Sequence, residues 1–185
     1  MAKLLRLHAH SQRFAAVQIQ VEVARPSVDR LALSYIVTGK MSDVRILPVM
    51  ATARSDKLWE HTCFEAFVRA SSGAEYYEFN FAPSTQWAAY RFSSYRAGKC
   101  NAIEITAPEI EVQSSSDRYT LHASFRLDCL SALPRNSMWQ LGLSALIEEK
   151  ISGRKSYWAL AHPPGKPDFH HTDSFIHEFS PAGQI

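Results

Sequence analysis

Apolar and polar side chains alternate with a period of two along much of this chain of 185 residues. In 17–23 the order is valine, glutamine, isoleucine, glutamine, valine, glutamate and valine, and 31–37 and 119–127 repeat the pattern. Successive side chains of a β-strand point to opposite faces. This period therefore predicts strands that pack one face against a core.

Further segments of the same character predict the strands Lys3–His8, Cys63–Ala70, Glu75–Ala82, Trp87–Ser93, Ala102–Thr106, Trp139–Glu148, Ser156–Leu160 and Phe175–Phe179. Turn-forming residues lie between them. Helical character is confined to 128–133, where Asp128 is a candidate N-cap and Pro134 ends the segment. Many short strands with almost no helix favour an all-β fold, an antiparallel β-sandwich of jelly-roll or immunoglobulin-like type. The length fits one domain, residues 1–185.

Charge and composition exclude two classes of partner. A formal net charge of +2 without a dense run of lysine or arginine argues against nucleic acid. No stretch approaches the ~20 apolar residues of a membrane span, so no membrane partner is expected. The first residues lack the apolar core of a secretory signal. Cys63, Cys100 and Cys129 form no CxxC pair, so we expect reduced thiols and a cytoplasmic location.

Three regions carry polar residues that a simple core does not need. In the first, Glu65 shares a strand face with Cys63 and Phe67. A carboxylate among apolar neighbours is costly to bury unless it is paired or hydrogen-bonded. The sequence leaves two interpretations open, an arginine partner or a contact to a ligand.

The second region is the predicted hairpin that follows. Alternation places Glu78 and Asn80 on one face, and Trp87 and Arg91 share a face of the next strand, just after Gln86. Aromatic rings stack on the C–H faces of sugars and polar side chains bond their hydroxyls, so this mixture suits a carbohydrate. The alternative is an exposed sheet face with a cross-strand pair of Glu78 and Arg91.

The third region is a proline-rich loop from His162 to Asp173, which also holds Asp168, His170 and His171. Histidine and aspartate together raise the question of a metal site. Neighbouring residues of an extended chain point opposite ways, so two adjacent histidines do not share one metal ion. The pattern favours a structural loop in which these side chains satisfy backbone groups.

These three stretches resemble the DOMON-like superfamily. A Leu-Trp before an acid-bearing strand, then Tyr-Glu-Phe-Asn-Phe-x-Pro-Ser, then Trp and Arg, is similar to the family-nine carbohydrate-binding modules. The motif Tyr-Trp-Ala-Leu-x-His-Pro…Pro-Asp-Phe-His-His-x-Asp-x-Phe is similar to bacterial DOMON-like proteins without an assigned activity. The resemblance extends from Trp59 to Phe175.

The resemblance implies an antiparallel β-sandwich with a binding site on or at the edge of one sheet. The sugar-binding members clamp a terminal sugar between two tryptophans, which here implies Trp59 and Trp158. The polar contacts would come from Glu65, Asn80, Gln86 and Arg91. Other members hold haem through methionine and histidine, for which Met50, Met138 and the region of His170 are the candidates. A structural calcium ion is a further possibility.

The expected function is non-catalytic binding of a sugar or sugar phosphate, with Lys166 and His170 as candidates for a phosphate contact. No catalytic residue and no metal ligand is assigned. The expected ligand-binding residues are Trp59, Glu65, Glu78, Asn80, Gln86, Trp87, Arg91, Trp158, His162, Lys166, Asp168 and His170. One alternative is a glycoside hydrolase, which needs two carboxylates across a cleft. A haem protein or an interaction domain are the others.

Overall fold

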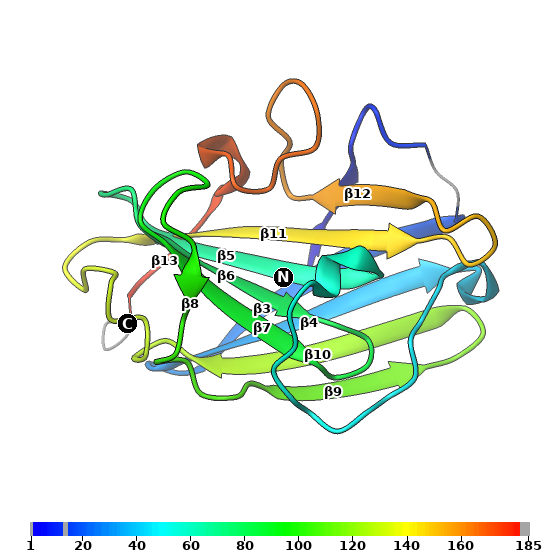
Figure 1. The fold of residues 1–185 in the computed structure, drawn as a ribbon, viewed down its shortest axis with the longest axis horizontal. Helices are drawn as coiled ribbons and strands as arrows, with labels where there is room; N and C mark the ends of the chain where they lie inside the picture. Colours follow the sequence, from blue (N-terminus) through cyan, green and yellow to red (C-terminus); the bar gives the residue numbers. More distant parts are fainter. Residues whose placement is uncertain (1, 13–14, 182–185) are drawn as a thin grey trace.

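Two antiparallel β-sheets pack face to face and form a sandwich (Figure 1). The structure is a computed structural model that describes residues 2–12 and 15–181. Within these residues the first sheet has the strand order β1-β3-β4-β10-β9. The second has the order β2-β12-β11-β5-β6-β7-β8, and β13 pairs with β11. The predicted all-β sandwich is confirmed.

The first sheet consists of β1 (Ala2–Leu4), β3 (Val17–Ser27), β4 (Arg30–Gly39), β10 (Arg118–Arg126) and β9 (Glu109–Ser114). The second consists of β2 (Arg6–Leu7), β12 (Lys155–Ala159), β11 (Trp139–Glu148), β5 (Cys63–Ala70), β6 (Tyr76–Phe81), β7 (Trp87–Phe92), β8 (Cys100–Asn101) and β13 (His177–Phe179). Among the described residues, three short 3-10 helices lie between strands, η1 (Met41–Asp43), η2 (Leu58–Glu60) and η3 (Thr172–Ser174). No helix in the described ranges is long and apolar enough to cross a membrane.

Aromatic rings from both sheets fill the space between them. Phe79 of β6 stacks on Phe125 of β10 with ring centroids 4.2 Å apart, and Phe64 of β5 packs against Tyr35 of β4 at 5.0 Å. The side chain of Trp158 is also in this core and is 3% exposed. Burying such rings is the largest apolar contribution that single side chains make to stability.

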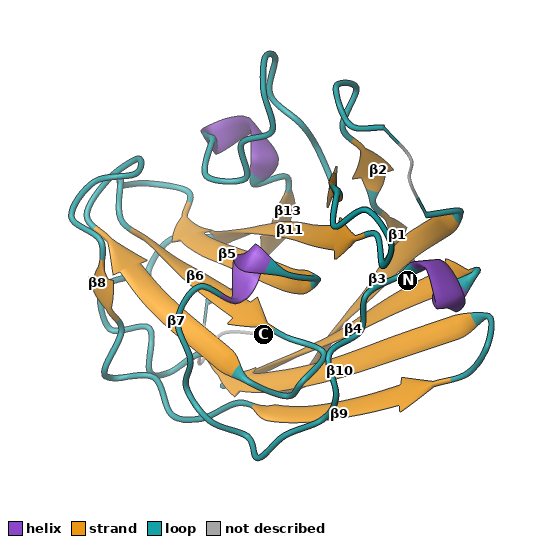
Figure 2. Cartoon of the chain, turned by 45° about the vertical axis from the view of Figure 1, so that its right-hand side comes forward, coloured by secondary structure: helices purple, strands orange, loops and turns teal. Residues whose placement is uncertain are grey.

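The outer face of the second sheet is buried as well. A second apolar cluster lies on it and includes Phe67, Tyr76 and Phe92 from the strands. Phe169 and Phe175, from the segment after β12, cover them. In Figures 1 and 2 this segment rises above the sheet beside β11 and β12 and returns toward β13. The central strands are therefore buried on both faces, and all six residues of β6 are buried.

Two predicted elements are turns in the structure, and in both the buried residues recur every three positions. The predicted strand Ala102–Thr106 is instead a turn, in which the Ile105 N–H donates to the Ala102 carbonyl at 3.2 Å. The expected helix at 128–133 is a pair of successive turns that bury Leu127, Leu130 and Leu133. The side chain of Asp128 accepts from Arg126.

Two further differences concern strands. The predicted strand Lys3–His8 is divided between the two sheets, as β1 and β2, with the buried Leu5 between them. The edge strand β9 was not predicted, although its Glu-Ile-Glu-Val order alternates. Ile110 and Val112 are only partly buried there.

We expect Trp158→Ala to lower the free energy of unfolding by about 3–5 kcal/mol, because it leaves a cavity in the core between the sheets. Urea denaturation measures this loss. Tyr157→Ala, one residue earlier on the opposite and partly exposed face of β12, is expected to cost less. Equal costs for the two variants would contradict the placement of Trp158 in the core.

Candidate functional site

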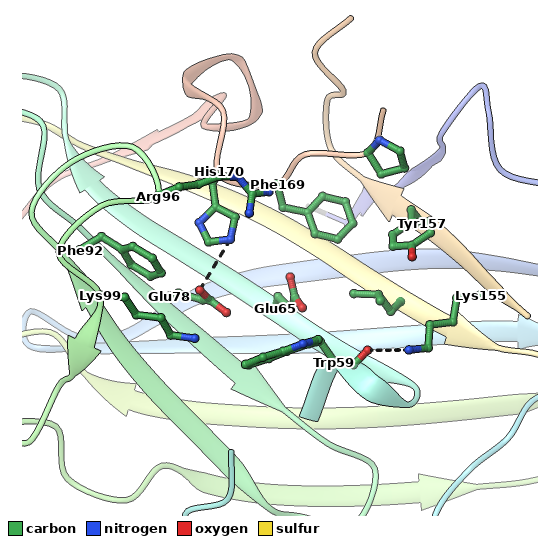
Figure 3. Close-up of a pocket in the computed structure, with 12 residues that line it drawn as sticks. Trp59, Glu65, Glu78, Phe92, Arg96, Lys99, Lys155, Tyr157, Phe169 and His170 are labelled. Atoms are coloured by element: carbon green, nitrogen blue, oxygen red, sulfur yellow. Dashed lines mark hydrogen bonds and ion pairs between the residues drawn. The ribbon is translucent and has the colours of Figure 1, made fainter. Parts of the chain in front are cut away.

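A cavity of about 460 Å³ opens on the outer face of the second sheet (Figure 3). This volume lies in the range of small-molecule sites. Its floor comes from β5, β6 and β11, and its walls come from η2, the segment before β8, β12 and the loop after β12. The lining residues are Trp59, Glu65, Glu78, Phe92, Arg96, Lys99, Leu146, Lys155, Tyr157, Pro167, Phe169 and His170.

Two carboxyl groups form the polar part of the floor. Glu65 pairs in register with Asn80 on the neighbouring strand, and Glu78 lies two residues before Asn80, so all three side chains are on the outer face. Asn80 Nδ2 donates to Glu78 Oε1 at 2.7 Å, and the Ser144 hydroxyl of β11 donates to Glu65 Oε2 at 3.3 Å. Glu65 and Glu78 are each 4% exposed. Two acidic groups are thus buried side by side at the bottom of the cavity.

Burial raises the pKa of both carboxyls. For Glu65 the pKa lies well above its ordinary value because of burial and, next, the charge of Glu78. For Glu78 burial is again the main cause, while the hydrogen bond from Asn80 and the charge of Lys99 oppose it. The two groups repel each other when both are ionised, so the pair retains protons to higher pH than free carboxylates do.

His170 belongs to the loop after β12, and its side chain packs over this floor. Its Nδ1 shares a 2.8 Å hydrogen bond with the Tyr76 hydroxyl, which also accepts from the backbone N–H of Arg96 at 3.2 Å. Its Nε2 lies 3.8 Å from Glu78 Oε2 (Figure 3). Burial, with the charge of Arg96, lowers the pKa of His170 to about 4. The imidazole is therefore neutral at pH 7.

Asp168 connects this loop to the segment before β8 through hydrogen bonds. Its carboxylate accepts from the Arg96 guanidinium at 2.8 Å, from the Tyr95 hydroxyl, and from the backbone N–H of His170 at 3.1 Å. Burial opposes ionisation, but the hydrogen bonds from Tyr95 and Arg96 lower the pKa of Asp168. These contacts hold the loop as a wall of the cavity. The backbone contact of Asp168 agrees with the structural interpretation of the loop, whereas its contacts to Arg96 and Tyr95 were not predicted.

An aromatic side chain and two lysines form the opposite wall. Trp59 packs edge-on against Tyr90, with ring centroids 6.1 Å apart. Lys99 Nζ lies 4.5 Å from the ring centre of Trp59 and 3.7 Å from that of Tyr90. Lys155 Nζ donates to the backbone carbonyl of Trp59 at 3.2 Å. Tyr157, beside Lys155 on β12, lines the same cavity.

The structure brings together some of the residues that the sequence predicted for the site. Trp59, Glu65, Glu78 and His170 line the cavity, and Asn80 supports Glu78 from beside it. Asp168 is near but acts on the walls through Arg96.

Trp158 does not face this cavity. Its side chain points into the core between the sheets, where its indole N–H donates to the Ser156 hydroxyl at 2.9 Å. Strand alternation then places Tyr157 on the outer face. The expected pairing of Trp59 and Trp158 is therefore corrected, and the aromatic residue of β12 in the cavity is Tyr157.

Glu78 of β6 faces the cavity, whereas Trp87 and Arg91 of the neighbouring strand β7 point to the opposite face of the sheet. Tyr90 is opposite Glu78 in the register, and Arg91 is opposite Tyr77, so the expected cross-strand pair of Glu78 and Arg91 is wrong. Trp87 is in the core between the sheets, and Arg91 pairs with Glu104 at 3.7 Å.

Three other expected residues lie outside the cavity. Gln86 precedes β7 in the turn, where its amide oxygen accepts from the Ser84 hydroxyl at 3.4 Å. His162 Nε2 donates to the carbonyl of Arg6 at 2.7 Å. Lys166 lines a separate surface hollow with Asp168.

Several lining residues were not predicted. Tyr157 stands in an apolar run in which either of two alternating sets could face inward, so the pattern alone does not distinguish it from Trp158. Lys99 and Lys155 resemble ordinary surface lysines in the sequence. Phe169 was visible only as one residue of the loop motif.

The candidate ligands for a metal ion or haem are scattered among the described residues. In the described ranges no group of three histidine, cysteine, aspartate or glutamate side chains could hold a metal. Met50 and Met138 are exposed, and neither lines the cavity that holds His170. The haem ligands suggested by the resemblance are thus not brought together.

The sequence matches no model of a known protein family and no curated protein. Solved structures share its fold. A proposed carbohydrate-binding protein from Bacteroides uniformis has a TM-score of 0.68 and 12% identity, over 96% of this chain and 84% of that protein. A family 9 carbohydrate-binding module from Caldicellulosiruptor kristjanssonii, solved with cellotriose and with glucose, has a TM-score of 0.57 and 11% identity in each case. All of this chain is covered, against 84% and 87% of the module. At such identities the likeness establishes the fold alone: the chain has the β-sandwich fold of the family 9 modules.

Proposed function

We propose that the cavity binds a sugar, or the end of a sugar chain, without chemical conversion. The observation that carries this proposal is the pair of buried carboxyls beneath an aromatic wall. Within the described ranges, neither Glu65 nor Glu78 has a lysine or arginine ion-pair partner, and the only histidine contact is His170 at 3.8 Å from Glu78. Burying two such acids costs stability, so a ligand that bonds them accounts for their retention.

Sugar hydroxyls are suited to this floor. A hydroxyl donates to an ionised carboxylate and exchanges donor and acceptor roles with a protonated carboxyl, so a floor with raised pKa values can bond several hydroxyls. The walls supply the complementary apolar surface, because Trp59, Tyr157 and Phe169 present rings to the same cavity. Such rings pack on the C–H faces of a pyranose.

The comparisons with solved structures support this proposal. The family 9 module that shares the fold was solved with cellotriose and with glucose, and the other neighbour is itself a proposed carbohydrate-binding protein. Hydrolysis is less well supported. Glycoside hydrolysis requires two carboxyl groups that flank the scissile bond, whereas Glu65 and Glu78 lie together on the floor of the cavity.

Calorimetric titration with glucose and cello-oligosaccharides tests the proposal. We expect Trp59→Ala to weaken binding by roughly tenfold or more, because the loss of a buried ring removes on the order of 1.5–3 kcal/mol of apolar contact. The matched control is Ile103→Ala, which truncates an exposed apolar side chain outside the cavity and should bind as the wild type does. Unchanged affinity of Trp59→Ala for a sugar that the wild type binds would contradict the site.

We expect Glu65→Gln to stabilise the protein at neutral pH while weakening sugar binding. The ordinary pKa of the group is 4.5 and burial raises it in the folded state. Between these two values the folded state therefore binds more protons than the unfolded chain, and stability falls as pH rises above 4.5. The amide introduced by Glu65→Gln does not ionise, so this loss of folding stability with rising pH should be absent from the variant.

Denaturation midpoints from about pH 5 to pH 8 measure the effect. Glu111→Gln is the matched control, because Glu111 is exposed on β9 of the other sheet and should leave the pH profile unchanged. A Glu65→Gln profile that falls with pH as steeply as the wild type does would contradict the raised pKa.

A further inference from the structure

Lys99 and Lys155 are not accounted for by a neutral sugar. Both line the cavity, one on each side of Trp59 in Figure 3. Neither makes an ion pair within 2–12 and 15–181. The third cation of the cavity, Arg96, differs from them because Asp168 binds its guanidinium at 2.8 Å. Two ammonium groups without an anionic partner therefore border the space proposed for the ligand.

The direct contacts that hold the two lysines in place come from neutral groups. Lys99 lies against the rings of Tyr90 and Trp59, at 3.7 and 4.5 Å. An aromatic face attracts a cation but does not neutralise it. Lys155 donates to the Trp59 carbonyl, a neutral acceptor, at 3.2 Å. An ammonium group has three donor hydrogens, so it can bond an anion in addition.

The floor does not fully balance these charges. Glu65 and Glu78 have raised pKa values, so the pair holds protons that would otherwise be lost. The acids lie at the bottom, on β5 and β6, and the lysines stand in the walls, before β8 and on β12. A ligand with hydroxyls at one end and negative charge at the other matches this separation.

We propose that the ligand is an acidic sugar, carrying a carboxylate or a phosphate, whose charge is attracted by Lys99 and Lys155 while its hydroxyls contact Glu65 and Glu78. This inference rests on the proposed sugar binding and names its ligand class. It assigns the charge to these two lysines, in place of the Lys166 expected from the sequence, which lines a different hollow.

Titrations with glucose, glucuronate, glucose 6-phosphate and inorganic phosphate test the inference. We expect at least one acidic sugar to bind about tenfold more tightly than glucose, because hydrogen bonds to charged groups are the stronger ones. Added salt should reduce the difference, since Lys99 is exposed. Inorganic phosphate should bind weakly because it lacks the ring. The acidic sugar that binds more tightly identifies the charged group.

Glucose that binds as tightly as both acidic sugars would overturn the inference and leave the proposed function standing. Absence of binding by every sugar would overturn both. Inorganic phosphate that binds as tightly as the acidic sugars would show an anion site without sugar recognition.

Variants that remove one lysine charge at a time show which side chains cause the preference for an acidic sugar over glucose. Lys99→Met and Lys155→Met should each reduce the ratio of acidic-sugar affinity to glucose affinity by about tenfold. Lys166→Met is the matched control and should keep the full preference. Both lysines also contact Trp59, so each variant is judged by the ratio of the two affinities, which a general weakening of sugar binding does not change. A preference that survives Lys99→Met, or that Lys166→Met removes, would contradict the assignment.

Discussion

The central strands of the second sheet are buried on both faces, and the site depends on this constraint. On the inner side β5 and β6 pack against the other sheet, and on the outer side the loop after β12 covers them. A strand in this position cannot place polar side chains in bulk water. The outward acids Glu65 and Glu78 therefore lie in a buried environment, and this burial raises their pKa values. An open sheet face would leave them as ordinary carboxylates.

Polar contacts hold the cover in position above this floor. Asp168 binds Arg96 and Tyr95 on the segment before β8, and the Tyr76 hydroxyl bonds His170 from below. These contacts connect the loop after β12 with the segment before β8, which is far from it in the sequence, and with strand β6. From the other side of the sheet, the Tyr35 hydroxyl donates to the backbone carbonyl of Glu65 at 2.6 Å. The site is thus fixed by both layers of the sandwich, which suits binding by a preformed cavity.

The distribution of charge follows from which elements carry it. Acids on the central strands are shielded from water, whereas Lys99 and Lys155 come from the margin of the cavity, where solvent still reaches them. Desolvation therefore acts strongly on the floor and weakly on the walls. His170, placed over the floor, becomes neutral for the same reason that the carboxyls tend to keep their protons. This distribution of charge is the basis of the proposal that the ligand places hydroxyls at the bottom of the cavity and an anionic group at its mouth.

The sequence by itself determined the fold class and much of the floor. Period-two alternation predicted most strands, and it correctly placed Glu78 and Asn80 on one face of β6 and Glu65 on the Cys63 face of β5. The register of the two strands then brings these three side chains to the same face of the sheet. The resemblance assigned Trp158 of β12 to the site, and alternation could not test this because both faces of β12 are apolar. Only the packed core shows that Trp158 points inward and Tyr157 outward. Alternation failed across the turn to β7, because the register that sets Tyr90 opposite Glu78 depends on how the strands pair. The lysines and the loop wall were decided by tertiary structure alone, since local pattern carries no information about which distant segments meet over a sheet.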